Sequence, residues 1–175
     1  MRIIAGFLGG RNFDAPKGHR THPMSEKARG GLFSALGDIK GLTILDAFAG
    51  SGAISMEAIS RGASLAVAID IDKSAIDTVK KNIKNLNIDN KIKTVRAAAS
   101  GWSNNNQDYK FDIIVCDPPY GTPEFNTLDK LTRHLKADGV FVLSWPGKEE
   151  SPKLPGLKIV KTKEYGDAKL IFYKR

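Results

Sequence analysis

Apolar positions along most of the chain alternate between short strand-like runs and one-sided helical patterns. LTILDAFAG, SLAVAID, KIKTVRA, FDIIVCD and VFVLSW predict strands, because short apolar runs are typical of strands buried on both faces. AISMEAISRG, closed by Gly62, and KSAIDTVKKNIKNLNI predict helices, the second with Ile76, Val79, Ile83 and Leu86 facing inward. Regular alternation of strand and helix predicts an α/β fold with a doubly wound, mostly parallel sheet.

The later part of the chain predicts a surface loop, one more helix and a hairpin. The Asn-rich stretch SNNNQD predicts a loop, and EFNTLDKLTRHLK predicts a helix closed by Asp138–Gly139. LKIVKTKEY and AKLIFYKR flank Gly166–Asp167 and predict an antiparallel hairpin that closes the sheet.

The N-terminal part has a different pattern from the rest. RIIAG and RNFDAP predict two short strands joined around Gly9–Gly10, a small hairpin outside the core. SEKARGGLFSAL predicts a helix with Ser25 as N-cap and Arg29 near the edge of an apolar face made of Ala28, Leu32, Phe33 and Leu36. We therefore expect an extension over residues 1–24 and a single globular unit over residues 25–175.

The 175 residues, 41% of them hydrophobic, suit one packed domain. The formal charge of +8 is unevenly placed. Residues 1–35 carry six Lys or Arg and two acidic residues, residues 36–144 carry thirteen of each, and residues 145–175 carry eight and four. Two basic ends around a neutral core favour a polyanionic partner such as nucleic acid, while a role in solubility alone is the alternative.

Several classes of protein and site are disfavoured by composition. No stretch approaches the roughly 18 apolar residues of a membrane span, and the opening is too short for a secretory signal, so we expect a cytoplasmic protein. Cys116, inside FDIIVC, is interpreted as a small buried hydrophobe. His19, His22 and His134 lack metal-ligand spacing and are interpreted as ordinary surface histidines, so no metal site is expected.

Two features at predicted strand ends indicate a nucleoside-containing cofactor. In DAFAGSG, residues 46–52, Gly50 and Gly52 allow close approach of a ligand, although a tight strand-to-helix turn alone also explains them. Asp70 ends the second strand, where a carboxylate can accept hydrogen bonds from ribose hydroxyls, and Asp72 is interpreted as the next N-cap. Because G-x-G-x-x-G is missing, S-adenosylmethionine fits better than a nicotinamide dinucleotide.

A third feature, DPPY at residues 117–120, suits catalysis on an exocyclic amino group of a nucleobase. The Asp117 carboxylate and the Pro118 carbonyl could each accept one N–H of that group, and the two prolines restrict the backbone there. Tyr120 could stack on a flipped-out base. A rigid turn with a surface tyrosine is the alternative.

With these three features, the chain as a whole resembles the RsmD family, bacterial methyltransferases that modify guanine N2 in 16S rRNA. The resemblance is carried by MRIIAGFLGGRNFDAP, THPMSEKARGGLFSAL, ILDAFAGSGAISMEAISRGA, DPPY and EYGDAKLIFY, and it covers nearly the whole chain in order. It implies a class I (Rossmann-like) methyltransferase fold with an N-terminal hairpin that helps to dock RNA. It also implies S-adenosyl-L-methionine as cofactor and partly assembled small ribosomal subunits as substrate.

The resemblance also implies roles for individual residues. The methionine end of the cofactor would be lined by Asp46, Phe48, Gly50 and Gly52, and the nucleoside end by Asp70, Ile71 and Ala98. Asp117, Pro118 and Tyr120 would receive the guanine. RNA would be contacted by basic residues of the N-terminal part, namely Arg2, Arg11, Arg20, His22 and Arg29.

The chain departs from the family pattern at three places. His22–Met24 stand where relatives usually show RPT, and Ala98 stands where a polar residue usually reaches the adenine. LSWPGK stands where relatives tend to show an acidic residue and a polar neighbour. The sequence nevertheless predicts a monomeric guanine-N2 methyltransferase of 16S rRNA. Two alternatives stay open: an adenine-N6 or cytosine-N4 methyltransferase of another nucleic acid, and a ribosome-assembly binding protein without turnover.

Overall fold

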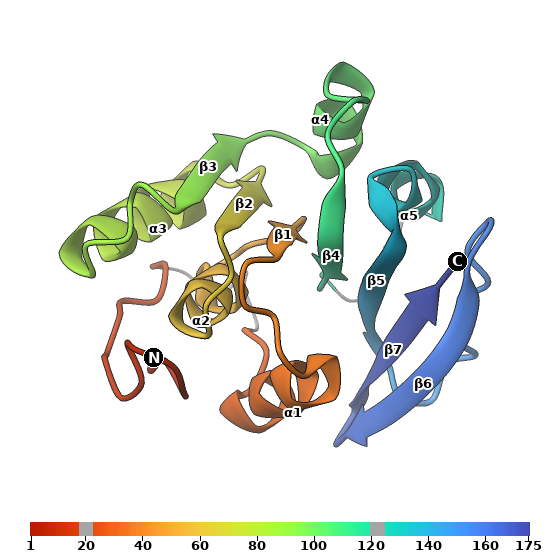
Figure 1. The fold of residues 1–175 in the computed structure, drawn as a ribbon, viewed down its shortest axis with the longest axis horizontal. Helices are drawn as coiled ribbons and strands as arrows, with labels where there is room; N and C mark the ends of the chain where they lie inside the picture. Colours follow the sequence, from red (N-terminus) through yellow and green to blue (C-terminus); the bar gives the residue numbers. More distant parts are fainter. Residues whose placement is uncertain (18–22, 120–124) are drawn as a thin grey trace.

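The computed structural model describes residues 1–17, 23–119 and 125–175 (Figure 1). The helices in these ranges are α1 (Glu26–Leu36), α2 (Ala53–Ser60), α3 (Lys73–Asn85), α4 (Ala99–Asn105) and α5 (Phe125–Thr132). The strands are β1 (Thr43–Asp46), β2 (Leu65–Asp70), β3 (Ile92–Arg96), β4 (Phe111–Cys116), β5 (Leu135–Pro146), β6 (Lys158–Tyr165) and β7 (Ala168–Lys174).

These strands form one sheet in the order β3-β2-β1-β4-β5-β7-β6. The first five strands along the chain are parallel, while β7 is antiparallel to both β5 and β6. The predicted doubly wound sheet and its closing hairpin are therefore confirmed. Because β2 and β4 flank β1 in parallel, their carboxyl ends lie side by side at one edge of the sheet, where ligands bind in folds of this kind.

Helices cover both faces of the sheet, and each face has its own hydrophobic cluster. α1, α2 and α3 pack on one face, and α4 and α5 pack on the other (Figure 1). Along β4, Ile113 and Val115 belong to the first cluster while Ile114 and Cys116 belong to the second, since successive strand residues point to opposite faces. Cys116 is fully buried, which confirms its interpretation as a small core residue.

The predicted helix starts at Ser25 and Asp72 are also confirmed. The Ser25 hydroxyl accepts the backbone N–H of Ala28 at 3.1 Å. The Asp72 carboxylate accepts the N–H groups of Ser74 and Ala75 at 2.6 and 3.2 Å. Each side chain thus satisfies amide groups that the first helical turn leaves without partners.

Two boundaries differ from the prediction. The stretch expected to be an Asn-rich loop begins inside α4, because Trp102 and Ser103 are buried there and their packing outweighs the weak helix propensity of asparagine. The following helix ends at Thr132 rather than at Asp138–Gly139, because Leu135 already pairs with Phe111 and begins β5.

His134 is buried, so the interpretation of this residue as a surface histidine is wrong. Its Nδ1 lies 2.8 Å from the backbone oxygen of Tyr109, and its Nε2 lies 2.8 Å from the hydroxyl of Ser103. Burial lowers the pKa of the imidazole. Since a carbonyl oxygen can only accept, Nδ1 is the donor to Tyr109, and the ring fastens α4 to the segment before β5.

The N-terminal segment belongs to the core, contrary to the expectation that it lies outside. The predicted hairpin is short: Arg2 and Asn12 form an antiparallel bridge, and backbone hydrogen bonds join Met1 to Phe13 and Ile3 to Gly10 and Arg11. Ile3, Leu8 and Phe13 are buried in the same cluster that packs on α1, α2 and α3. A two-stranded hairpin is marginally stable by itself, so burial of these three apolar side chains is expected to stabilise it against the core.

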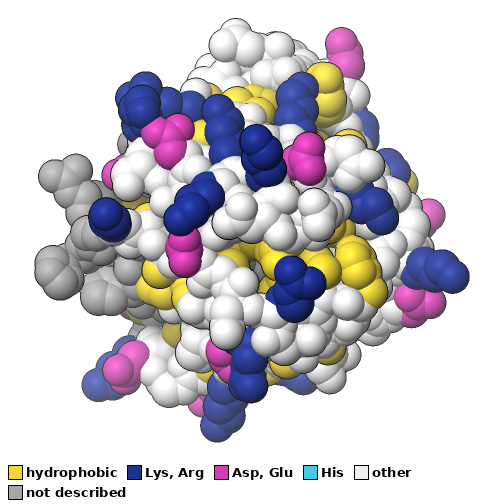
Figure 2. Space-filling view, turned by 90° about the vertical axis from the view of Figure 1, so that its left-hand side faces the viewer, with side chains coloured by type: hydrophobic (Ala, Val, Ile, Leu, Met, Phe, Trp, Pro, Cys, Tyr) yellow, Lys and Arg dark blue, Asp and Glu magenta, His cyan; other side chains and the backbone are white. Residues whose placement is uncertain are grey.

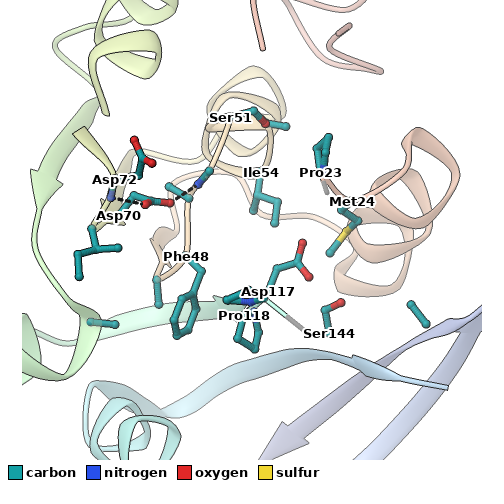
Figure 3. A pocket seen from close by; sticks show the side chains of 18 of the residues that line it. Pro23, Met24, Phe48, Ser51, Ile54, Asp70, Asp72, Asp117, Pro118 and Ser144 are labelled. Carbon is teal, nitrogen blue, oxygen red and sulfur yellow. Dashed lines mark hydrogen bonds between the residues drawn. The ribbon is translucent and has the colours of Figure 1, made fainter. Parts of the chain in front are cut away.

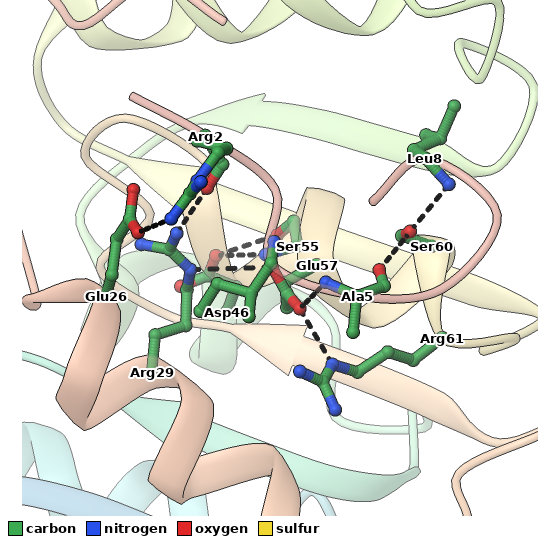
Figure 4. Close-up of polar contacts among 11 residues, drawn as sticks. Arg2, Ala5, Leu8, Glu26, Arg29, Asp46, Ser55, Glu57, Ser60 and Arg61 are labelled. Atoms are coloured by element: carbon green, nitrogen blue, oxygen red, sulfur yellow. Dashed lines mark hydrogen bonds and ion pairs between the residues drawn. The ribbon is translucent and has the colours of Figure 1, made fainter. Parts of the chain in front are cut away.

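A buried carboxylate on α2 holds the N-terminal segment in place. Glu57 is fully buried and accepts the backbone N–H groups of Ile4 and Ala5 at 2.7 and 3.1 Å (Figure 4). It also accepts the Nε–H of Arg61 at 2.7 Å and lies 3.7 Å from the Nε of buried Arg29 on α1. Segments distant in sequence are thereby joined through one side chain.

Candidate functional site

A cavity of about 900 Å³ opens at the carboxyl ends of β1, β2 and β4. Its volume lies within the usual range of small-molecule and cofactor sites. Figure 3 shows Asp70 and Asp72 toward one end of the cavity, and Asp117, Pro118 and Ser144 toward the other, beside Met24, with Phe48 in between. The three predicted features at the strand ends therefore face one space.

The glycine loop after β1 forms part of the cavity wall. Phe48 and Gly50 line the cavity, and Gly50 adopts a φ of +49° that a side chain would disfavour. Gly52 does not line it. This glycine is the N-cap of α2 with a φ of +74°, and a Cβ there would lie 2.8 Å from Val79, so it lets α2 pack closely on α3.

Asp70 holds the loop against the end of β2. Its carboxylate accepts the backbone N–H of Gly50 and the backbone N–H of Asp72, each at 2.8 Å. A carboxylate has about four acceptor positions, so further hydrogen bonds to a ligand remain possible. Ile71, which is 68% exposed, and Ala98, at the start of α4, line the cavity near this carboxylate.

Asp117 stands at the end of β4, where the strand leaves the sheet, and lines the cavity. Burial raises the pKa of its carboxyl group, and a hydrogen bond with Ser144 acts in the opposite direction. Pro118 is buried and Pro119 exposed. Tyr120 lies outside the described residues, as do Arg20 and His22.

Ser144 is a site residue that the sequence analysis missed. It is buried, comes from β5 and lines the cavity beside Asp117. Its signal in the sequence is a polar residue inside the apolar run VFVLSW, at a position where the chain passes the carboxyl end of β4. Met24, Ile54 and Tyr165 add to the cavity wall from the N-terminal part, α2 and β6, respectively.

Asp46 is buried and does not line the cavity, which corrects its expected place on the cofactor-facing surface. Its Oδ2 accepts the N–H and the hydroxyl of Ser55, while Oδ1 has no hydrogen-bond partner within residues 1–17, 23–119 and 125–175. Burial raises its pKa to about 7, and the carboxylates of Asp117 and Asp70 add to the rise. Asp46 is thus a carboxyl group whose charge is disfavoured by its surroundings.

We expect Asp46→Asn to stabilise the protein by an amount that grows with pH. The folded-state pKa of Asp46 lies above the ordinary 3.8, so between about pH 4 and about pH 7 the native state holds a proton that the unfolded chain has released. The contribution of Asp46 to the unfolding free energy therefore falls as the pH rises, by at most about 4 kcal/mol. Urea unfolding of both proteins at pH 5 and pH 8 measures this effect. A difference that is equal at both values would contradict it.

Among the expected RNA-binding residues, Arg2 and Arg11 are exposed, but Arg29 is not. Arg2 forms an exposed ion pair with Glu26 at 2.8 Å. Arg29 is fully buried, donates to the backbone oxygen of Arg2 at 2.6 Å and pairs with Glu57. The prediction that Arg29 contacts RNA is therefore wrong, because its guanidinium group is buried and interacts with groups of the protein itself.

The cavity combines carboxylates at both ends with apolar walls, which suits a ligand that has a polar sugar and an apolar or aromatic part. Within residues 1–17, 23–119 and 125–175, no group of three or more His, Cys, Asp or Glu side chains could hold a metal ion. In the same ranges, no helix is both long and apolar enough to cross a membrane.

Comparison with known proteins gives consistent matches over the whole chain. The family model described as "Conserved hypothetical protein 95" matches residues 1–174. "Putative rRNA methyltransferase YlbH" from Bacillus subtilis is 32% identical, with 100% of this chain and 99% of that protein covered. "Ribosomal RNA small subunit methyltransferase D" from Buchnera aphidicola is 40% identical over 67% of this chain and 62% of that protein.

Solved structures match the fold as well. "Putative methyltransferase yhhF" from Escherichia coli has a TM-score of 0.89 and 27% identity, with 100% of this chain and 97% of that chain covered. A SAM-dependent methyltransferase from Thiobacillus denitrificans, solved in complex with S-adenosyl-L-homocysteine, has a TM-score of 0.63 and 21% identity over 73% of this chain and 52% of that chain.

Proposed function

Because the chain belongs to the Conserved hypothetical protein 95 family, the RsmD family, we propose that it is an S-adenosylmethionine-dependent methyltransferase of small-subunit rRNA that modifies guanine N2. One observation carries the proposal. Asp70 at the end of β2 and Asp117 at the end of β4 line the same cavity, with the glycine loop between them. A cofactor at one end and a nucleobase at the other would then be neighbours.

The residues at the Asp70 end suit the cofactor. The Asp70 carboxylate can accept hydrogen bonds from both ribose hydroxyls, in the way that an acidic residue after the second strand does in nucleotide-binding folds. Gly50 leaves room for the backbone to approach the ligand, and Phe48 provides an apolar wall. Ile71 and Ala98 would enclose the adenine by packing, since neither side chain can hydrogen-bond.

The residues at the Asp117 end suit the nucleobase. When bound, S-adenosylmethionine would supply an electrophilic methyl group, which the guanine N2 would take up while the carbon–sulfur bond breaks and sulfur keeps its electron pair. Asp117 and the Pro118 carbonyl would accept the two N–H bonds of the amino group and thereby aim the nitrogen lone pair. Asp117 would also stabilise the developing positive charge, and the proton would pass to solvent or to Asp117. Tyr120 remains the candidate for stacking on the base.

Positioning accounts for most of the proposed rate enhancement. Holding two reactants in line can lower a barrier by about 7 to 11 kcal/mol in favourable model reactions. Buried residues at the Asp117 end favour such positioning. Ser144 holds Asp117 by a hydrogen bond, and the ring of Pro118 fixes the backbone angle φ directly after Asp117.

The proposal is tested by methyl transfer from labelled S-adenosylmethionine into small ribosomal subunits that lack modification, followed by nucleoside analysis. Labelled N2-methylguanosine is the expected product. N6-methyladenosine or N4-methylcytosine would contradict the choice of base, and free 16S rRNA tested in parallel distinguishes an RNA substrate from an assembled one. Cofactor binding without label in subunits, rRNA or DNA would favour an assembly binder without turnover.

Asp70→Ala is expected to weaken S-adenosylmethionine binding by about 10- to 100-fold. The estimate corresponds to about 1.5 to 3 kcal/mol, the usual value of a hydrogen bond to a charged group. Isothermal titration calorimetry of wild type and variant measures the change. Asp89→Ala, at an exposed position after α3, provides the control. Unchanged affinity in a folded Asp70→Ala protein would rule out the assignment of Asp70 to the ribose.

A further inference from the structure

The outward face of α3 carries a stripe of lysines. The buried side of this helix consists of Ala75, Ile76, Val79, Asn82 and Ile83. Lys73, Asp77, Lys80 and Lys84 follow one another at intervals of three or four residues, so they share the exposed side. Three of these four exposed side chains are cationic.

β3 extends the same basic surface to the rim of the cavity. It is an edge strand of the sheet, next to β2 alone. Lys93 and Arg96 of β3 are exposed, and Arg96 pairs in register with Asp70, which lines the cavity. The segment immediately after Arg96 also lines it, through Ala97 and Ala98. An anion bound along α3 and β3 would therefore meet the cavity at the end of β3.

Most of this positive charge forms no ion pair among the described residues. Residues 73–96 carry seven Lys or Arg and two Asp, a formal charge of +5 within a segment that appeared neutral when summed over 36–144. Lys73 pairs with Asp77 and Lys81 with Asp14. Among the described residues, no ion pair involves the other five cations of the segment, which are Lys80, Lys84, Lys91, Lys93 and Arg96.

Two exposed aromatic rings stand beside this surface, each with a lysine over it. Lys91 Nζ lies 5.7 Å from the ring centroid of Phe7, which is 64% exposed. Lys93 Nζ lies 5.5 Å from the ring centroid of Tyr109, which is 45% exposed. Exposed rings next to cations are typical of surfaces on which single-stranded nucleic acids lay their bases and phosphates. Figure 2 shows this side of the molecule, where Lys and Arg outnumber Asp and Glu.

We propose that the exposed face of α3 and β3, with Phe7 and Tyr109, binds the backbone of an RNA substrate and leads it to the cavity. The identity of the partner as RNA rests on the proposed function. The placement rests on the five cations that form no ion pair among the described residues, on the two exposed rings and on the position of Arg96 beside Asp70 and Ala97, which line the cavity. The protein would then have two RNA-binding surfaces, this face and the N-terminal part with Arg2 and Arg11.

Protection of a sheet edge is a simpler explanation for some of these lysines, because charged side chains on edge strands prevent pairing with other chains. It applies to Lys93 on β3. It does not apply to Lys80 and Lys84, which lie on a helix. The opposite edge of the sheet, β6, carries Lys158, Lys161 and Lys163 and therefore supplies a matched control.

The test compares the triple variant Lys80→Ala, Lys84→Ala, Arg96→Ala with the control Lys158→Ala, Lys161→Ala, Lys163→Ala. Both lose three positive charges. Binding to 16S rRNA transcribed in vitro is measured at several salt concentrations. The α3/β3 variant is expected to lose affinity on the order of 10²-fold at about 0.1 M salt and to lower the slope of log K against log salt by about 2 to 3, since each phosphate contact contributes about 0.7 to 0.9. The control is expected to change by about threefold or less.

Equal losses in the two variants, or no loss in the α3/β3 variant, would overturn the proposal. Methylation kinetics separate its failure from that of the proposed function. If wild type methylates rRNA and the α3/β3 variant keeps the same KM, the surface is wrong and the function stands. If wild type binds rRNA but transfers no methyl group, and only the α3/β3 variant loses binding, the surface stands and the function is wrong.

Discussion

Replacing Asp117 with alanine is expected to lower kcat for methyl transfer by about 10²- to 10⁴-fold, the range usual for the loss of a group that acts only on the reacting atoms. Cofactor affinity should stay within about twofold, because Asp70 and the glycine loop supply the cofactor contacts of the proposal. Steady-state kinetics on unmodified small subunits, with calorimetry for the cofactor, measure both quantities. Near-wild-type turnover in a folded Asp117→Ala protein would remove Asp117 from the mechanism.

Two further measurements sharpen this result. Asp138→Ala removes a carboxylate from an exposed position of β5 and should leave kcat unchanged. In wild type, kcat should fall as the pH drops through the pKa of Asp117, because only the ionised carboxylate has the negative charge that stabilises the developing positive nitrogen. Burial raises that pKa above the ordinary 3.8, so the loss should begin at a higher pH than for an exposed aspartate.

The second large effect is on stability. Glu57→Ala is expected to lower the free energy of unfolding by about 3 to 5 kcal/mol, because it leaves the buried guanidinium of Arg29 without its counter-ion. It also removes the acceptor of the backbone N–H groups of Ile4 and Ala5. Urea denaturation measures the loss, and limited proteolysis should show faster cleavage within residues 1–13.

Matched variants distinguish this effect from an unspecific one. Glu149→Ala removes an exposed carboxylate and should change stability by less than about 0.5 kcal/mol. The double variant Arg29→Met, Glu57→Leu removes both buried charges and should recover part of the loss, because no uncompensated charge remains. If Glu57→Ala were as stable as wild type, Glu57 would not hold the N-terminal segment.

Apart from α4, the order of strands and helices, both N-caps and the closing hairpin could be predicted from the sequence, since each depends on residues close together in the chain. The helix α4 was missed because burial of Trp102, a tertiary contact, overrides the turn-like composition of its sequence. The helix α5 was predicted too long for the same reason. Its apolar pattern continues through Leu135, but pairing with Phe111 makes that residue part of β5.

The candidate site was predictable only in part. Asp70, Asp117 and Gly50 follow predicted strands, and in a parallel sheet their position at one edge follows from the topology. Ser144 could not be assigned to the site from the sequence, because its contact with Asp117 depends on how β5 pairs with β4. Asp46 and Gly52 belong to the same motif as Gly50, yet neither lines the cavity. The Asp46 carboxylate is hydrogen-bonded to Ser55, and Gly52 packs against Val79.

Periodicity and motifs that are local in the chain are thus enough to predict the α/β architecture, the edge of the sheet where the site lies and the family. Which charges are free to meet a ligand depends on tertiary packing instead. Arg29 forms a buried ion pair with Glu57. The cations of α3 and β3 are exposed, although residues 36–144, which include them, have a formal charge of zero. A charge sum along a chain contains no information about burial or about the distance between charges, and electrostatic attraction depends on both.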